Sequence, residues 1–377
     1  MYRINKFLFP LFVSAFLILP AARLSAQTQQ RPLTSKEFVS LLYMLPRSPQ
    51  TRDELIEEIR RRGIGFPLTD GMRSLVATKS GNDSLLRRTL EEAERRRVNP
   101  TASALPSETE GRELLERTRN VTLAAANAMP DFLVKQIIKR SYAFGNTGTW
   151  KQHDNITLAV GYRANAGEEY RLLTLNGMPV PEEVRNSSDY SKYAPGAMSS
   201  GVEYVSSVAS LFRPESKAEF KIVDTDVVQG RRTVVYEYVV KKESGTLTLI
   251  SSGARAAVGS RGRVWIDREL DRVLRFEQIA TEIPGDFPII ATNTLIDYDW
   301  VAINERKYLL PTHSVVMLTS NHGQTVVQDR NDIRFRSYQK YGAELKVIDE
   351  VGEDDEPAEP EPPPKPPKTD KPIRPPQ

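Results

Sequence analysis

The sequence predicts an α+β protein in which a small N-terminal helical bundle precedes one large antiparallel sheet. Between residues 33 and 97, apolar residues recur every three or four positions, which is the spacing of amphipathic helices. From Phe132 onward, apolar and polar residues alternate instead, and Gly, Asn and Asp separate the alternating runs. Crossover helices between these runs are missing, so the pattern favours antiparallel neighbours over a βαβ fold.

The first 26 residues have the pattern of a secretory signal peptide. Arg3 and Lys6 precede an apolar run of 14 residues that ends at Pro20, and small residues follow up to Ala26. We expect cleavage near Ala26 and a mature protein in the periplasm or outside the cell. The run is shorter than the ~20 residues of a membrane span, and no second apolar run of that length follows. The sequence therefore predicts a protein that does not span the membrane.

Composition excludes several classes of site. The chain has no cysteine, which excludes disulfides, thiolate metal sites and lipid attachment through a cysteine. The net charge of +3 comes from Arg3, Lys6 and Arg23, and the rest of the chain has 49 basic and 49 acidic residues. Because phosphate binding depends on a basic surplus, this balance gives no reason to expect a nucleic-acid partner.

Residues 31–98 are predicted to form a module of four short helices. Each helix opens on a residue pair or quartet with capping chemistry, and Arg-rich stretches stand at helix ends, where cations suit the helix dipole. Gly63 directly follows Arg60-Arg-Arg62 and predicts the end of the second helix. The four predicted starts are Thr34–Glu37, Ser48-Pro49, Thr69-Asp70 and Asn82-Asp83.

Two low-complexity stretches and one longer helix complete the non-sheet part. Residues 99–110 are rich in Pro, Ser and Thr and predict a linker. Gly111–Ala128 predicts a helix, with Leu114, Leu115, Val121 and Ala125 along one side. Residues 348–377 are first acidic and then Pro-rich, and we expect this tail to be disordered or extended.

About eleven strands are predicted, with one helix among them. The helix, over residues 201–212, has an apolar stripe that we expect to be buried on the concave face of the sheet. The predicted strands are Phe132–Tyr142, Thr149–Arg163, Glu169–Leu175, Ala218–Val228, Thr233–Lys241, Gly245–Ile250, Val264–Asp267, Val273–Ile279, Thr292–Ile303, His313–Ser320 and Gln324–Phe335.

Residue patterns that support catalysis or metal binding are weak. The three histidines, His153, His313 and His322, have no metal-ligand spacing and are interpreted as structural. The pairs Asp224/Asp226 and Asp297/Asp299 each place two carboxylates on one face of a strand. Such pairs could bind Ca²⁺ or act in acid–base catalysis, but a solvated strand face is favoured. Asp267 and Asp271 are interpreted as residues of an exposed turn. We therefore predict no enzyme, no cofactor and no metal site.

The remaining candidate site is apolar. Apolar residues of several predicted strands alternate with polar neighbours, and those of the 201–212 helix recur at helical spacing, so the sheet has one apolar face that a helix covers. This face is either an ordinary filled core or an incompletely filled concavity that accepts a lipid. The candidate ligand-binding residues are Leu158, Val160, Val205, Phe212, Val264, Ile266, Leu274 and Phe276.

The region from Phe132 to about Val347 resembles the LolA/LolB-type periplasmic lipoprotein carriers. The resemblance rests on the signal peptide, the helix before the first strand, the strand series and the hairpin Val264-Trp-Ile-Asp267 to Val273-Leu-Arg-Phe276. It implies a curved antiparallel sheet that forms an unclosed half-barrel, over residues 111–347, with helices packed at its mouth. The stretch Ile59–Phe66 is similar to a helical module of secreted proteins from Acidobacteria-like genomes.

Two functions follow from these features. The first is a non-enzymatic envelope protein that binds an apolar ligand, such as a lipid or the acyl chain of a lipoprotein, in the half-barrel. The second is an envelope interaction or scaffold protein whose helical module and Pro-rich tail hold a protein partner.

Overall fold

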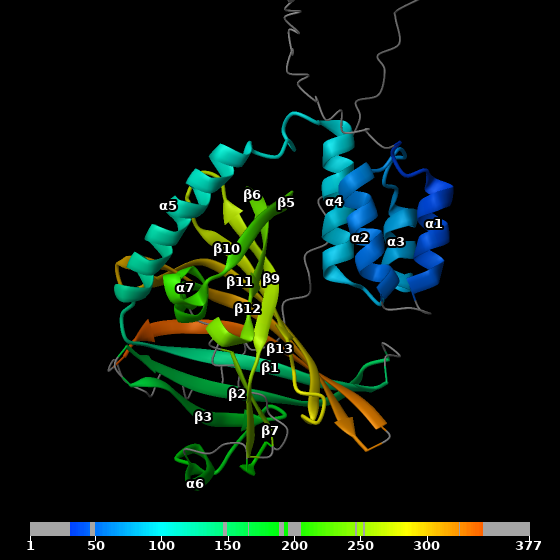
Figure 1. The fold of residues 1–377 in the computed structure, drawn as a ribbon. Coiled ribbons are helices and arrows are strands. Elements are labelled where there is room, and N and C mark those ends of the chain that lie inside the picture. Colours follow the sequence, from blue (N-terminus) through cyan, green and yellow to red (C-terminus); the bar gives the residue numbers. More distant parts are fainter. Residues whose placement is uncertain are drawn as a thin grey trace, which may run out of the picture.

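The computed structural model describes residues 31–45, 50–145, 149–164, 166–187, 192–194, 205–245, 247–251, 253–323 and 325–341 (Figure 1). The predicted signal peptide, the tail 348–377 and the predicted first helical residue Pro49 lie outside these ranges. Among the described residues, no helix is both long enough and apolar enough to cross a membrane.

Four helices form the N-terminal module, and their ends follow the capping residues. They are α1 (Ser35–Met44), α2 (Gln50–Arg62), α3 (Asp70–Lys79) and α4 (Ser84–Val98). The Thr34 and Glu37 side chains form a reciprocal capping box, and Thr69 and Asp83 cap α3 and α4. Gly63 has φ +68° directly after α2, a conformation that glycine adopts without strain. The predicted signals at Thr34, Gly63, Thr69 and Asp83 are confirmed here, whereas the predicted start at Ser48-Pro49 lies outside the described residues.

Three further helices accompany the sheet. α5 (Glu108–Asn127) begins before the predicted Gly111, because Ser107 and Glu110 form a second capping box. The other two are the short α6 (Glu182–Arg185) and α7 (Val205–Phe212). α5 and α7 lie together on the concave side of the sheet (Figure 1).

The main sheet has eleven antiparallel strands in the order β4-β3-β2-β1-β13-β12-β11-β10-β9-β6-β5, and its two end strands do not pair with each other. It is therefore open. β7 (Thr248–Ser251) and β8 (Ala254–Ala257) form a separate hairpin. The strands of the main sheet are β1 (Phe132–Phe144), β2 (Lys151–Arg163), β3 (Gly167–Leu175), β4 (Met178–Pro179), β5 (Glu219–Val228), β6 (Arg231–Val240), β9 (Gly259–Asp267), β10 (Val273–Thr281), β11 (Ile289–Ile303), β12 (Arg306–His322) and β13 (Thr325–Lys340).

The predicted fold class, a helical bundle followed by an open curved antiparallel sheet, is confirmed. The strand predictions differ in two details. The segment predicted over Gly245–Ile250 lies in the small hairpin, and the two-residue strand β4 takes the eleventh place in the main sheet. Ten of the predicted strands correspond to strands of the main sheet: eight are longer than predicted, whereas β2 and β5 are slightly shorter.

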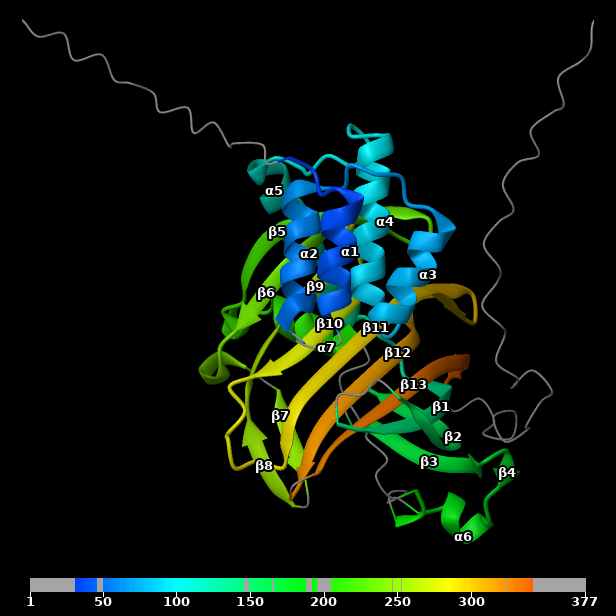
Figure 2. The ribbon, with the colours of Figure 1, turned by 90° about the vertical axis from the view of Figure 1, so that its right-hand side faces the viewer.

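The sheet is covered on both faces at the β9–β10 region. Helices α1–α4 lie against the outer face, in front of β9, β10 and β11 in Figure 2, while α5 and α7 lie on the other side. The module and the sheet share one hydrophobic cluster, to which the sheet contributes Val228, Val235, Trp265 and Leu274. A second cluster joins α5 and α7 to the inner faces of β6, β9, β10 and β11. A third fills the half of the sheet built from β1, β2, β3, β12 and β13.

Candidate functional site

An apolar pocket lies at the mouth of the half-barrel, between the two concave-side helices and the sheet. Its volume is about 130 Å³. One wall is formed by α5 and α7, and the floor is formed by the start of β10 and by β11 and β12. The lining residues are Thr122, Ala125, Ala128, Met129, Val208, Arg272, Val273, Tyr298, Trp300, Lys307, Tyr308 and Leu309.

Small side chains on α5 create this space. Thr122 and Ala125 lie three positions apart and therefore share one side of the helix, and Ala128, the residue that caps its C-terminus, follows three positions later. Nearer the N-terminus of the same helix, Leu114 is buried in the inner-face cluster. The apolar side chains on this side of α5 therefore become smaller, from leucine to alanine, toward its C-terminal end. The smaller side chains leave a space between the helix and the sheet that larger ones would fill.

The open side of the pocket combines aromatic and basic groups. Trp300 is 41% exposed, Lys307 is exposed, and Arg272 is half-buried. Among the described residues, the pocket lining contains these two basic residues and no acidic residue. Burial lowers the pKa of the Arg272 guanidinium, and the charge of Asp271 opposes that shift. The pocket is thus apolar inside and positive at its edge.

The predicted apolar residues are core residues and do not line this pocket. The seven whose side chains are described are at most 1% exposed, and none of them is among the lining residues. Phe212, Val264, Ile266 and Phe276 meet in the inner-face cluster, whereas Leu158 and Val160 belong to the cluster of the β1–β3 half. Val205 is the first residue of α7, but its side chain lies outside the described part.

Leu274 lies on the opposite face from its predicted partners. The pairing of β10 with β9 shifts between Val273 and Arg275, which marks a β-bulge at this point. One extra residue in a strand reverses the alternation, so Leu274 points to the helical module while Val273 and Phe276 face inward. The expectation that Leu274 shares a face with Phe276 is therefore wrong.

The residues that line the pocket were largely missed from the sequence. Ala125 was placed on the apolar stripe of α5, and that stripe is the signal that could have located the wall. The turn from Asp267 to Arg272 was interpreted as a corner of the sheet. Asp267 does hold that corner, since its Oδ1 accepts hydrogen bonds from the backbone N–H groups of Glu269 (2.8 Å) and Leu270 (3.0 Å). Asp267 is 1% exposed, however, so its interpretation as an exposed turn residue is wrong. Arg272 at its end, however, also lines the pocket.

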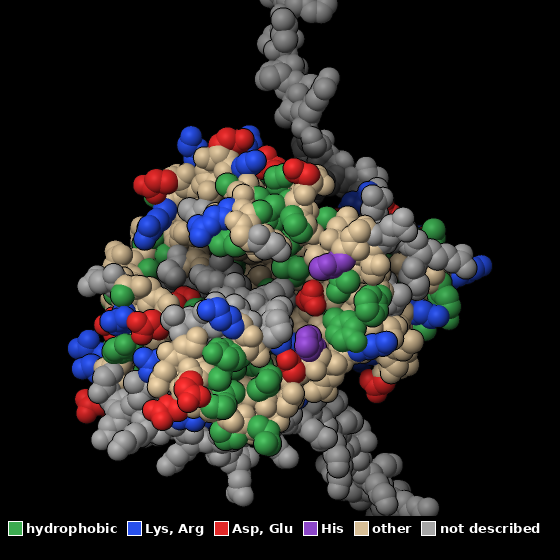
Figure 3. All heavy atoms as spheres, turned by 90° about the horizontal axis from the view of Figure 1, so that it is seen from below, with side chains coloured by type: hydrophobic (Ala, Val, Ile, Leu, Met, Phe, Trp, Pro, Cys, Tyr) green, Lys and Arg blue, Asp and Glu red, His purple; other side chains and the backbone are tan. Residues whose placement is uncertain are grey.

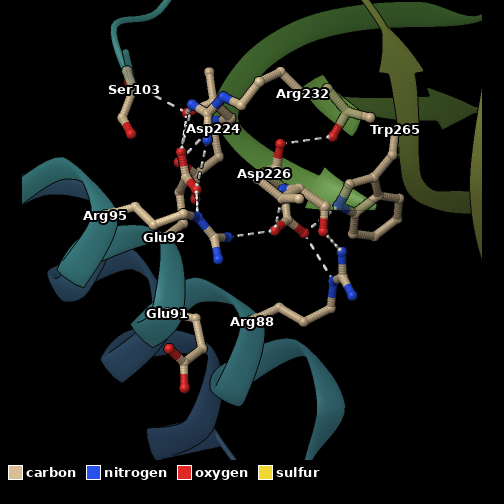
Figure 4. A network of polar contacts seen from close by, with 12 residues as sticks. Arg88, Glu91, Glu92, Arg95, Ser103, Asp224, Asp226, Arg232 and Trp265 are labelled. Carbon is tan, nitrogen blue, oxygen red and sulfur yellow. Dashed lines mark hydrogen bonds and ion pairs between the residues drawn. The ribbon is translucent and has the colours of Figure 1, made fainter. Parts of the chain in front are cut away.

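A buried ionic network fastens the helical module to strand β5 (Figure 4). The Asp226 carboxylate accepts hydrogen bonds from Arg88 Nε at 2.8 Å and Arg95 Nη2 at 2.9 Å, both on α4. Trp265 Nε1 on β9 donates to the same carboxylate at 3.0 Å. Both carboxylate oxygens of Asp226 thereby accept hydrogen bonds, as the burial of a charged group requires.

Asp224 and Glu92 extend the same network. The Asp224 carboxylate accepts hydrogen bonds from Arg96 Nη2 (2.5 Å) and Arg60 Nε (3.3 Å). Burial raises the pKa of Asp224, although the charges of these two arginines act to lower it. Glu92 on α4 binds Arg232 at 3.0 Å. Asp224 and Asp226 share one face as predicted, but each is 4% exposed. The preference for a solvated strand face is therefore wrong, because the module covers this face.

The outer face also carries a cross-strand row of charges around His313. His313 Nε2 lies 2.9 Å from Asp332 Oδ1, and its Nδ1 lies 3.7 Å from Asp297 Oδ2. Burial opposes protonation of His313, but hydrogen bonds to Asp297 and Asp332 outweigh it and raise the pKa to about 9. Burial likewise opposes ionisation of Asp297, but hydrogen bonds from His313 and Arg275 lower its pKa to about 2. This arrangement is a set of ion pairs.

The raised pKa of His313 predicts a loss of stability in base. A pKa raised from 6.5 to about 9 contributes stability that is complete below pH 6.5 and lost as the pH rises through about 9. Since 39% of the side chain is exposed, solvent screening limits the effect to about 1 kcal/mol. Urea unfolding of the wild type and of His313→Gln should give free energies that differ at pH 7 and converge by pH 10. If the difference in the free energy of unfolding between the two proteins stayed the same from pH 7 to pH 10, the raised pKa of His313 would be contradicted.

The other histidines do not assemble a site. His322 Nε2 lies 3.1 Å from Ser320 Oγ, and His153 Nδ1 lies 3.6 Å from Asp154. Within the described ranges, no group of three or more His, Asp or Glu side chains is placed to hold a metal ion. On the face seen from below, acidic, basic and apolar side chains are interspersed, and no single charge dominates it (Figure 3).

No protein-family model matches the chain, and no curated protein matches it significantly. Solved structures do match it. A LolA superfamily protein from Nitrosomonas europaea is 10% identical, with 63% of this chain and 96% of that chain covered and a TM-score of 0.29. A DUF1329 family protein from Desulfovibrio piger is 11% identical, with 64% and 97% covered and a TM-score of 0.30.

A third match is a putative outer membrane lipoprotein-sorting protein domain from Vibrio parahaemolyticus. It is 11% identical, with 63% of this chain and 97% of that chain covered and a TM-score of 0.26. The first match carries the name of the superfamily that the sequence resembles.

Proposed function

We propose that this chain is a non-enzymatic cell-envelope protein that binds an apolar ligand, a lipid or the acyl chain of a lipoprotein, in the pocket between α5, α7 and the sheet. The observation that carries the proposal is the mostly apolar lining of a pocket at the mouth of the half-barrel, beside the cluster that joins α5 and α7 to the sheet. A pocket lined mostly by apolar and aromatic side chains, with a few polar groups at its edge, is the usual form of a small-molecule site. The export pattern of residues 1–26 supports a periplasmic or extracellular location.

The size of the pocket limits what enters it. A volume of about 130 Å³ is close to the ~150 Å³ of an apolar cavity that holds one benzene molecule. The pocket in this conformation therefore suits the end of an acyl chain, with the rest of the molecule outside. Four buried methylenes would contribute about 3 kcal/mol at ~0.8 kcal/mol each, before the cost of ordering the chain.

A pocket-filling substitution tests the proposal. Ala125→Trp places a large side chain into the pocket from α5, and we expect it to weaken binding of the neutral fluorescent probe N-phenyl-1-naphthylamine at least about tenfold. Titration of the purified protein with the probe measures the affinity. Native mass spectrometry of the same preparation identifies any lipid that is retained from the cell.

Ala124→Trp is the matched control, because Ala124 is exposed on the same helix and is not among the lining residues. The control should bind the probe as the wild type does. If the wild type, Ala125→Trp and Ala124→Trp bound the probe with equal affinity, the probe would bind outside this pocket. If the wild type did not bind the probe at all, the proposal would be wrong.

The alternative, a scaffold that uses the helical module to hold a partner, has less support. The apolar side chains on the inward faces of α1–α4 are packed in the cluster that they share with Trp265 and Leu274. Several arginines of α4 are engaged by Asp224 and Asp226. These groups serve to attach the module to the sheet and are not available to a partner.

A further inference from the structure

The basic edge of the pocket indicates what kind of molecule enters it. Arg272 and Lys307 stand at the open side of a pocket that has no acidic residue among its described lining residues. Lys307 lies on β12 and Arg272 directly precedes β10, so two separate parts of the chain bring a positive charge to the same opening. A neutral apolar ligand would not need either charge.

Arg272 has hydrogen-bonding capacity that the described part of the protein does not use. Its Nη1 atom is buried and has no hydrogen-bond partner among the described residues. The carboxylate that acts on it is that of its neighbour Asp271, whose Oδ2 accepts a hydrogen bond from Arg117 Nε at 3.0 Å and whose Oδ1 is likewise buried without a hydrogen-bond partner among the described residues. A buried guanidinium N–H without an acceptor costs free energy, which would be recovered if the Arg272 side chain turned toward a ligand oxygen in the pocket.

The chemistry of the two residues selects an anion. A guanidinium offers paired N–H donors that match the oxygens of a carboxylate or a phosphate, and an ammonium adds a point charge. The exposed indole of Trp300 and the ring of Tyr308 line the same pocket and suit the boundary between an apolar chain and its polar end.

We propose that the ligand is a single-chain amphiphile with an anionic end group, whose apolar chain enters the pocket under α5 and whose carboxylate or phosphate is bound by Arg272 and Lys307. This inference rests on the proposed function, and it adds the chemical class of the ligand. It predicts that the end group, as well as chain length, determines affinity.

Competition with the neutral probe tests the proposal with four ligands of one chain length: octanoate, octyl phosphate, octanol and octyltrimethylammonium. Both anions should displace the probe at concentrations at least about tenfold lower than octanol, since a hydrogen bond to a charged group is stronger than one between neutral groups. The cation should be the weakest. Whichever of octanoate and octyl phosphate binds more tightly identifies the end group.

The double substitution Arg272→Gln/Lys307→Gln should bring the affinities for octanoate and octanol within about twofold of each other and leave the affinity for octanol unchanged. Lys139→Gln, at an exposed position on β1 that is not among the lining residues, is the control and should keep the preference for anions. Equal affinities of the wild type for octanoate and octanol would overturn this inference and leave the proposed function standing. Failure of every ligand to displace the probe would overturn both.

Discussion

Replacing Asp226 by Asn should destabilise the protein by about 3 kcal/mol. The substitution keeps the shape of the side chain but removes the negative charge that Arg88 and Arg95 share. Two cations then remain at an interface where one carboxylate had compensated them, and breaking a buried ion pair from one side costs ~3–5 kcal/mol. We expect the lower end because Arg88 and Arg95 are 25% and 36% exposed. Urea unfolding followed by circular dichroism measures the loss.

The control is Glu169→Gln, which removes the partner of Arg163 in an exposed ion pair of 2.7 Å. Exposed pairs contribute ~1 kcal/mol or less, so this variant should unfold almost as the wild type does. If Asp226→Asn lost no more stability than Glu169→Gln, the network in Figure 4 would not hold the helical module in place.

Local signals allowed most of the helices to be predicted. Capping residues such as Thr34 and Asp83 act within one turn of their own helix, so their effect is readable without knowledge of the fold. The same applies to the alternation of the strands, which depends only on the backbone geometry of each strand. The prediction that the sheet is curved and unclosed rested on the family resemblance. Curvature and closure depend on the order in which strands pair, and this order is a property of the whole chain.

Which face of a strand is covered could not be predicted in the same way. The alternation placed Asp224 and Asp226 on one face, but only the packing of α4 against β5 decides that this face is buried. The bulge at Leu274 is a second case, since pairing with β9 reverses the direction of that side chain. Both errors arise where a tertiary contact overrides a local pattern.

The pocket was missed for a related reason. A cavity is made by the absence of large side chains at positions that come together in space, and here these positions lie on α5, α7, β10, β11 and β12. In a sequence, large apolar residues are the natural candidates for an apolar binding site. Val264 and Phe276 are instead fully buried in the core of this protein. The small residue Ala125 and the turn residue Arg272 are more informative about the site.

The second large effect is expected at Gly262, in the middle of β9. A Cβ atom at this position would overlap the carbonyl oxygen of Glu277 on the paired strand and lie 2.7 Å from its carbonyl carbon. The same carbonyl oxygen accepts a hydrogen bond from the hydroxyl of Tyr238, which is 1% exposed, at 3.0 Å. Gly262→Ala must therefore push two strand backbones apart and strain a buried hydrogen bond.

We expect Gly262→Ala to lower the free energy of unfolding by about 3 kcal/mol, at the upper end for an overpacked core, because backbone atoms cannot rotate away as a side chain does. Gly285→Ala is the matched control, since a Cβ atom there would have no neighbour within 4 Å. That control should change stability by less than about 1 kcal/mol. Urea unfolding of both variants decides the point: equal stabilities would mean that β9 and β10 can separate at Gly262, and that the close approach of these strands does not fix the inner wall of the half-barrel.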